Sequence, residues 1–137
     1  MIENLASWIP SIIAPIGWFI VHILSKKRDF HAERRRFADT TINRIEQIES
    51  LAKQYHTNKS RSIENEEELL SCLQKLEDRL QYLTNKKNSF SFIPFKANIT
   101  MYNFQTKDFT KQRYNSQLVR DISTSSITLI NQLLNIK

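Results

Sequence analysis

Glycine is almost absent from this chain, since Gly17 is the only one among 137 residues. Loops that cradle phosphates need several glycines, because glycine adopts positive φ at little cost and lets the backbone approach a ligand closely. The composition therefore excludes Walker-type and Rossmann-type nucleotide sites. Proline is also scarce, at three residues. A chain this poor in turn formers is best suited to long helices joined by few tight turns.

Residues for catalysis and metal binding are scarce as well. The single cysteine, Cys72, excludes a disulfide within the chain and lies in the apolar stretch 69–73, which is typical of a reduced thiol packed in a helix. His22, His31 and His56 are far apart in the sequence, and none has a second ligand at the spacing of a metal site. The sequence therefore predicts no enzymatic activity, no metal and no cofactor.

The longest apolar stretch lies near the start of the chain. Residues 5–24 contain no Asp, Glu, Lys or Arg, and a helix of this length reaches about 30 Å, the thickness of the hydrocarbon core of a bilayer. This predicts a transmembrane anchor over residues 1–25. Glu3 is the only charged side chain before the stretch, whereas basic residues follow it. The positive-inside rule then predicts an N-terminus outside and a cytosolic remainder.

Three other interpretations of this stretch fit less well. A cleaved signal peptide would place its positive charges before the apolar segment and end in an A-x-A-like site. An interfacial helix would show more of a polar face than Ser7, Ser11 and His22 provide. A buried helix of a soluble domain is compatible with Pro10 and Pro15, but membrane helices tolerate proline better than most.

Two sets of residues around the expected span are candidates for contacts. Small residues at positions i, i+4 and i+7 form a stripe along which spans could pack and oligomerise. Basic residues after the span are expected to bind anionic lipid headgroups. Nucleic acid is disfavoured as a partner, because three consecutive arginines point in different directions on a helix. The span-packing set is Ser7, Ser11 and Ala14, and the headgroup set is Lys26, Lys27, Arg28, Arg34, Arg35 and Arg36.

The rest of the chain shows the apolar spacing of amphipathic helices. We expect helices over about residues 26–56, 62–87 and 108–136. The second has the clearest heptad pattern, starts at the N-cap residue Ser62, and begins with carboxylates expected to be solvated. No amphipathic helix buries its apolar face alone, so the fold class predicted is all-α, with an antiparallel three-helix cytosolic bundle over residues 26–137. The heptad leucines are Leu69, Leu73, Leu76, Leu80 and Leu83, and the carboxylates are Glu64, Glu66, Glu67 and Glu68.

An aromatic-rich connection is expected between the second and third of these helices. Residues 88–107 interrupt the helical spacing and hold five aromatic side chains that are costly to leave in water. We expect an ordered loop or a short extended segment here. Phe95 and Phe104 are predicted to pack inward, and Phe90 and Phe92 are the candidate interface with a partner.

Two segments carry a resemblance to known proteins. The sequences ERRRFADTTINRIEQIESLA (residues 33–52) and FKANITMYNF (residues 95–104) resemble those of small uncharacterised bacterial inner-membrane proteins. These have one N-terminal span, a basic helix, a leucine-rich helix and an aromatic connection with an F-[KR]-x-x-[IL]-T pattern. The resemblance implies a bacterial source, an inner-membrane location and the same architecture. Some proteins of this build belong to mobile elements and antiphage defence systems.

These observations favour a non-enzymatic, membrane-anchored interaction or scaffold module. It would self-associate or bind a cytosolic protein through its helices, and the resemblance suggests an accessory role in a defence or mobile-element system. A first alternative is a membrane-perturbing effector, toxin-like or holin-like, that oligomerises through its span. A weaker alternative is a nucleic-acid binder held at the membrane.

Overall fold

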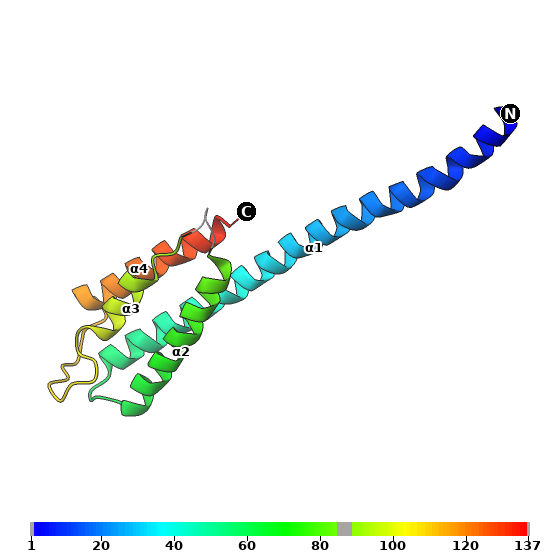
Figure 1. Ribbon diagram of the computed structural model, residues 1–137. Helices are drawn as coiled ribbons and strands as arrows, with labels where there is room; N and C mark the ends of the chain where they lie inside the picture. Colours follow the sequence, from blue (N-terminus) through cyan, green and yellow to red (C-terminus); the bar gives the residue numbers. More distant parts are fainter. Residues whose placement is uncertain (1, 85–88, 137) are drawn as a thin grey trace. The chain divides into compact units, whose positions relative to one another are not determined.

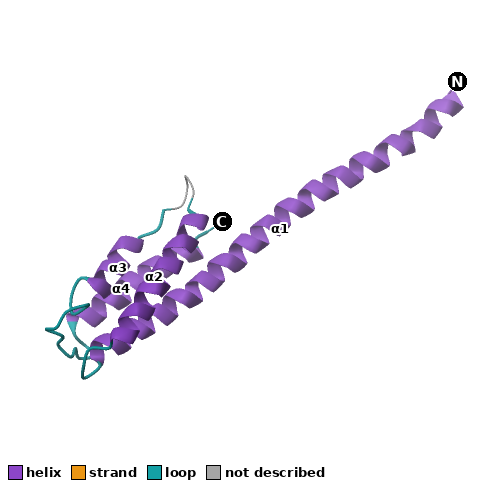
Figure 2. Ribbon diagram, turned by 60° about the horizontal axis from the view of Figure 1, so that its bottom comes forward, coloured by secondary structure: helices purple, strands orange, loops and turns teal. Residues whose placement is uncertain are grey.

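The computed structural model describes residues 2–84 and 89–136, and it describes side chains within the first helix from Ala14 onward. Four helices follow one another: α1 (Ile2–Thr57), α2 (Ile63–Leu83), α3 (Phe92–Thr100) and α4 (Gln117–Leu134) (Figure 1). The described residues form no strand (Figure 2). The prediction of an all-α fold is therefore confirmed.

The chain divides into two compact units, Met1–Arg35 and Arg36–Lys137. The first consists of the N-terminal part of α1. The second contains the remainder of α1 together with α2, α3 and α4, and it holds the hydrophobic core.

The prediction of a transmembrane anchor over residues 1–25 is wrong. In the part of the chain that the structure describes, no helix is long and apolar enough to cross a membrane. The described side chains of α1 include charged ones from Lys26 onward, and no stretch of them is apolar over the length that a hydrocarbon core of about 30 Å requires. The same finding overturns the single-pass topology and the inner-membrane location, while the side chains of residues 5–13 lie outside the described residues.

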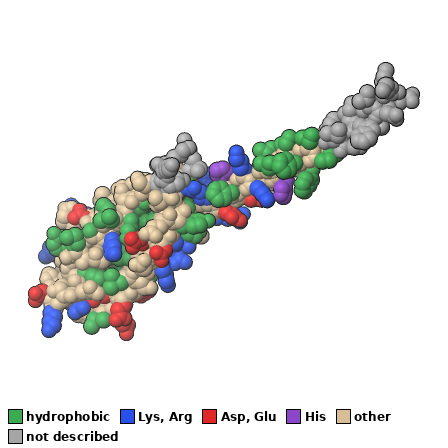
Figure 3. Space-filling model, in the orientation of Figure 1, with side chains coloured by type: hydrophobic (Ala, Val, Ile, Leu, Met, Phe, Trp, Pro, Cys, Tyr) green, Lys and Arg blue, Asp and Glu red, His purple; other side chains and the backbone are tan. Residues whose placement is uncertain are grey.

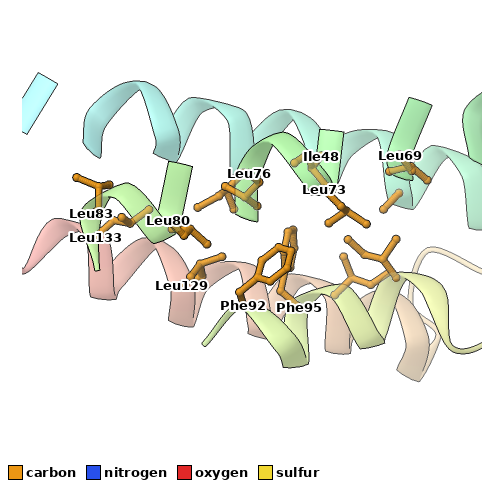
Figure 4. Close-up of a cluster of buried hydrophobic side chains, with 14 of the residues drawn as sticks. Ile48, Leu69, Leu73, Leu76, Leu80, Leu83, Phe92, Phe95, Leu129 and Leu133 are labelled. Carbon is orange, nitrogen blue, oxygen red and sulfur yellow. The ribbon is translucent and has the colours of Figure 1, made fainter. Parts of the chain in front are cut away.

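The core of the second unit forms where the apolar stripes of four helices meet (Figure 4). Residues spaced three and four apart line one face of a helix, and those faces are buried here. All five leucines of the α2 heptad pattern are at most 3% exposed. The matching residues of α1 are Ala38, Ile45, Ile48, Ala52 and Tyr55, and those of α4 are Val119, Ile122, Leu129 and Leu133.

Side-chain caps fix the starts of α2 and α4. The hydroxyl of Ser62 accepts a hydrogen bond from the backbone N–H of Asn65 at 3.3 Å. Ser116 caps α4 in the same way, accepting from the N–H of Val119 at 3.4 Å. Each cap satisfies one of the backbone donors that a helix leaves unpaired in its first turn.

The aromatic connection differs from the loop that the sequence predicts, because its centre is the helix α3. Phe92, Phe95 and Ile99 follow helical spacing and are all buried. Pro94 lies in the first turn of α3, where a helix does not need the backbone N–H that proline lacks. The last helix also begins later than expected, at Gln117, so residues 101–116 form a long non-helical segment.

Candidate functional site

A buried polar network lies where the turn between α1 and α2 meets residues 101–116. Its centre is the carboxylate of Glu66, which is 2% exposed. Arg61 donates two hydrogen bonds to it, from Nε to Oε1 at 2.6 Å and from Nη2 to Oε2 at 2.9 Å. The Tyr55 hydroxyl donates to Oε1 at 2.6 Å. The backbone N–H of Gln105 also donates to Oε1, at 3.1 Å. The hydrogen bonds from Arg61, then that from Tyr55, hold the pKa of Glu66 below its usual range.

Tyr55 connects this network to the hydrophobic core. Its side chain is fully buried and packs edge-on against Phe104, at 5.5 Å between ring centroids, and against Phe109, at 5.4 Å. Burial, followed by the hydrogen bond to Glu66, raises the pKa of the Tyr55 phenol well above its ordinary value. The phenol therefore stays protonated and donates its hydrogen to the carboxylate.

His56 holds α3 and residues 101–116 to the end of α1. Its Nε2 lies 3.0 Å from the carbonyl oxygen of Ile99, and its Nδ1 lies 3.4 Å from the amide nitrogen of Asn103. Both contacts are satisfied by a neutral ring in which Nε2–H donates and Nδ1 accepts. Burial lowers the pKa of His56, and the backbone carbonyl of His56 accepts from the N–H of Gln112 at 2.8 Å.

Residues 101–116 contain two positions with left-handed backbone. Asn103 has φ 59° and Gln105 has φ 52°, a conformation that costs side-chain-bearing residues free energy. The Asn103 side chain compensates by pairing with Thr110, donating to its carbonyl at 2.8 Å and accepting from its N–H at 2.6 Å. The network thus fixes an irregular segment and satisfies its polar groups internally. This arrangement stabilises the fold.

Stability is expected to fall in mild acid because His56 is buried in its neutral form. Its folded pKa lies below the unfolded value of 6.5, so the unfolded chain binds more protons as the pH falls through that value. The stabilisation that neutral His56 gives is fully present above the pKa that His56 has in the unfolded chain. It is lost as the pH falls toward the lower pKa that His56 has in the folded protein. Denaturant unfolding at about pH 7.5 and about pH 5.5 measures the loss. The lowered pKa of Glu66 also makes the folded protein less stable in acid, but only once the pH falls below the usual range of carboxyl pKa values.

A matched pair of variants separates the effect of His56 from that of an exposed histidine. His56→Gln should be less stable at both pH values and show a much smaller drop between them. His31→Gln, at an exposed position, should keep the full drop. An undiminished drop in His56→Gln would contradict the assignment.

No metal site accompanies the network. The described residues contain no group of three or more His, Cys, Asp or Glu side chains placed to hold a metal ion. Cys72 is half-buried on α2 against the core and carries no disulfide.

The second feature of interest is an apolar surface on α1, which we call the α1 apolar segment and define as residues 16–30. Its large apolar side chains are between 45% and 67% exposed. Four of them are consecutive, from Trp18 to Val21, and at 100° per residue they point to all sides of the helix. The exposed side chains are Ile16, Trp18, Phe19, Ile20, Val21, Ile23, Leu24 and Phe30, and Figure 3 shows such side chains gathered along this helix.

A heptad pattern runs along this segment. Ile16, Ile23 and Phe30 are seven residues apart at the a positions, and Phe19 takes the d position after Ile16, whereas Lys26 takes the next one. Such spacing places side chains on one stripe facing a partner helix. The sequence interpretation missed this pattern because it treated the stretch as a lipid-facing span, for which apolar spacing carries no information. The spacing itself was visible in the sequence.

The predicted headgroup residues all lie on α1. Arg34 is half-buried, whereas Lys26, Lys27, Arg28, Arg35 and Arg36 are exposed. Their binding to anionic lipid headgroups stays a prediction, which cosedimentation with anionic vesicles would test. Of the predicted span-packing residues, Ala14 is exposed and the side chains of Ser7 and Ser11 lie outside the described residues.

The candidate interface residues Phe90 and Phe92 both contact the core. Phe92 is 9% exposed and belongs to the buried cluster, while Phe90 is partly buried against it. Their rings are therefore occupied within the bundle. The exposed large apolar side chains of this region are those of Ile93, at 79%, Met101 and Tyr102.

Comparison of the chain with protein-family models, with curated proteins and with solved structures gives no match. The function is therefore argued from the geometry of the molecule.

Proposed function

We propose that this chain is a non-enzymatic interaction module that self-associates through the α1 apolar segment. The observation that carries the proposal is the exposure of its eight large apolar side chains. Full burial of a side chain of this size stabilises by about 1.5–3 kcal/mol, so leaving the set in water is costly. A helix that is apolar on all sides is usually covered on all sides.

Further copies of this chain are the partner that fits the segment best. One partner helix covers a single stripe, so several helices are needed to cover Trp18, Phe19, Ile20 and Val21 together. Residues 16–25 of the segment carry no Asp, Glu, Lys or Arg, so copies pack along this part of it without charge repulsion. The proposed assembly is an oligomer of at least three chains that presents several copies of the helical bundle.

The alternatives considered from the sequence gain no support here. The toxin-like or holin-like effector was argued from the predicted membrane span, and no observation on the described residues favours it. No observation on the described residues favours the nucleic-acid binder.

Replacing Ile23 by Asp is the test of this proposal. The charge would be buried among the packed helices at a cost of several kcal/mol per chain, so the oligomer should dissociate. Sedimentation equilibrium should give a multiple of the chain mass of 16.2 kDa for the unaltered protein and the single-chain mass for Ile23→Asp. The helical content should remain close to that of the unaltered protein, because the core of the second unit is untouched.

Ile127→Asp is the matched control. Ile127 is 57% exposed on α4, an exposure like that of Ile16, and its replacement should leave the oligomer intact. A single-chain mass for the unaltered protein would contradict the proposal, as would an oligomer that Ile23→Asp leaves unchanged.

A further inference from the structure

A groove of about 390 Å³ lies between α3 and α4, two helices that pack side by side in the second unit (Figure 1). Its size falls within the range of small-molecule sites. Apart from Pro94, every lining residue carries a polar group, although carbon atoms make up most of the surface exposed in the groove. The groove shares no residue with the Glu66 network or with the α1 apolar segment. The polar groups are the amide of Asn98, the carboxylate of Asp121 and the hydroxyls of Ser91, Thr124, Ser125 and Thr128.

Nearly every donor hydrogen of this lining is already used within the protein. The three hydroxyls on α4 bond back to carbonyl oxygens one turn earlier in their own helix, as serine and threonine often do. Thr124 donates to Arg120 at 2.9 Å, Ser125 to Asp121 at 2.8 Å and Thr128 to Thr124 at 3.0 Å. These hydroxyls therefore have only lone pairs left for a ligand.

The donor hydrogens of the Asn98 side-chain amide are also used within the protein. Its Nδ2 donates to the backbone carbonyl of Asp121 and to the hydroxyl of Ser125, at 3.1 Å each. These two bonds fix the orientation of the amide and leave its Oδ1 as an acceptor. The Asp121 carboxylate accepts one hydrogen bond, from Gln117 at 2.7 Å, which leaves its second oxygen available. Ser91 alone keeps a hydroxyl hydrogen that is not used, since its Oγ accepts from Gln132 at 2.9 Å.

The groove thus combines several acceptors, one negative charge and a single donor. We propose that it binds a primary ammonium group, carried by a small alkylamine or by a lysine side chain of a partner. An ammonium offers three donors and no acceptor, which complements this lining. Its bond to the Asp121 carboxylate is charge-assisted and correspondingly strong. A neutral polyol needs donors for its own lone pairs, and an anion is repelled by Asp121.

Binding to the full-length protein can be followed by NMR as the backbone amide signals of Asn98 and Asp121 and the side-chain amide signals of Asn98 shift. The probes are 1,4-diaminobutane and Nα-acetyl-lysine amide, and the one that binds more tightly identifies the source of the ammonium group. Both should shift these signals saturably, whereas glycerol should not. Absence of a saturable shift with either amine at about 10 mM, a concentration where even weak sites fill, would overturn the proposal.

Two variants of the groove and one control variant make the test specific. Asp121→Asn keeps the shape of the groove and removes its charge, so the Kd for either amine should rise about tenfold or more. Thr124→Val, at an exposed position, should weaken binding severalfold by removing one acceptor. Asp108→Asn removes an exposed carboxylate outside the groove and should leave the Kd unchanged. Equal affinity in Asp121→Asn and in the unaltered protein would also overturn the proposal, whether or not the protein self-associates.

Discussion

Replacing Glu66 by alanine should lower the free energy of unfolding by about 2–4 kcal/mol. The substitution leaves the N–H of Gln105 without its acceptor and removes the nearer acceptor of the buried Tyr55 hydroxyl, which keeps only the carbonyl oxygen of Asn103 at 2.9 Å. It also removes the partner of Arg61, but Arg61 is partly exposed and can turn toward water, which keeps the loss below that of a fully buried ion pair. Urea unfolding monitored by circular dichroism measures the difference.

Glu67→Ala is the control for this prediction. Glu67 is the next residue of α2 and is exposed, so its replacement should change stability by no more than about 0.5 kcal/mol. Similar small effects of the two substitutions would show that the Glu66 network does not stabilise the bundle.

The second large effect is expected from Phe95→Ala. The Phe95 ring is fully buried between α3 and the rest of the core, and its removal leaves a cavity that the packed helices fill only in part. The expected loss is about 3–5 kcal/mol of unfolding free energy, measured by the same denaturant unfolding.

Ile93→Ala tests whether the loss comes from burial. It removes apolar atoms two residues away in α3, at a position that is 79% exposed, and should cost little. A loss in Ile93→Ala as large as that in Phe95→Ala would contradict the orientation of α3.

The parts of the fold that the sequence predicted well are those with regular apolar spacing. In α2, five leucines at intervals of three and four define one face, and that face is buried. The same holds in the second unit for the stripe of α1 that ends at Tyr55. Local spacing is sufficient in these cases, because an amphipathic helix reveals its buried side whichever helix covers it.

The helix α3 was missed for a local reason. Its spacing, Phe92, Phe95 and Ile99, lies among other aromatic residues that hide the period. Pro94 is compatible with this helix, because it lies in the first turn, where proline is tolerated. A helix of nine residues also offers too few turns for its period to be distinguished from its surroundings.

The Glu66 network could not be predicted, because its partners are far apart in the chain. Tyr55 lies 11 residues before Glu66 and Gln105 lies 39 residues after it. In sequence Glu66 is one of several acidic residues at a helix start, and nothing local separates it from its solvated neighbours. The left-handed conformation of Asn103 and Gln105 arises from the same long-range contacts, so residue type alone does not predict it.

The membrane span was predicted from the apolar character of residues 5–24 alone. Apolar character shows that a helix needs to be covered, but it does not identify what covers it. The heptad spacing of Ile16, Ile23 and Phe30 is the feature that favours other helices, and it is the basis of the proposed self-association.

Trp18 provides the most direct measurement of whether further copies of the chain cover this segment. The sequence has two tryptophans, so Trp8→Phe leaves Trp18 as the only one, and Trp18 is 67% exposed in a single chain. In the full-length variant, Trp18 fluorescence should be blue-shifted and protected from acrylamide quenching at high protein concentration, and both effects should disappear on dilution or in Ile23→Asp. Quenching that is strong at every protein concentration would contradict self-association, and so would protection that appears only after anionic vesicles are added.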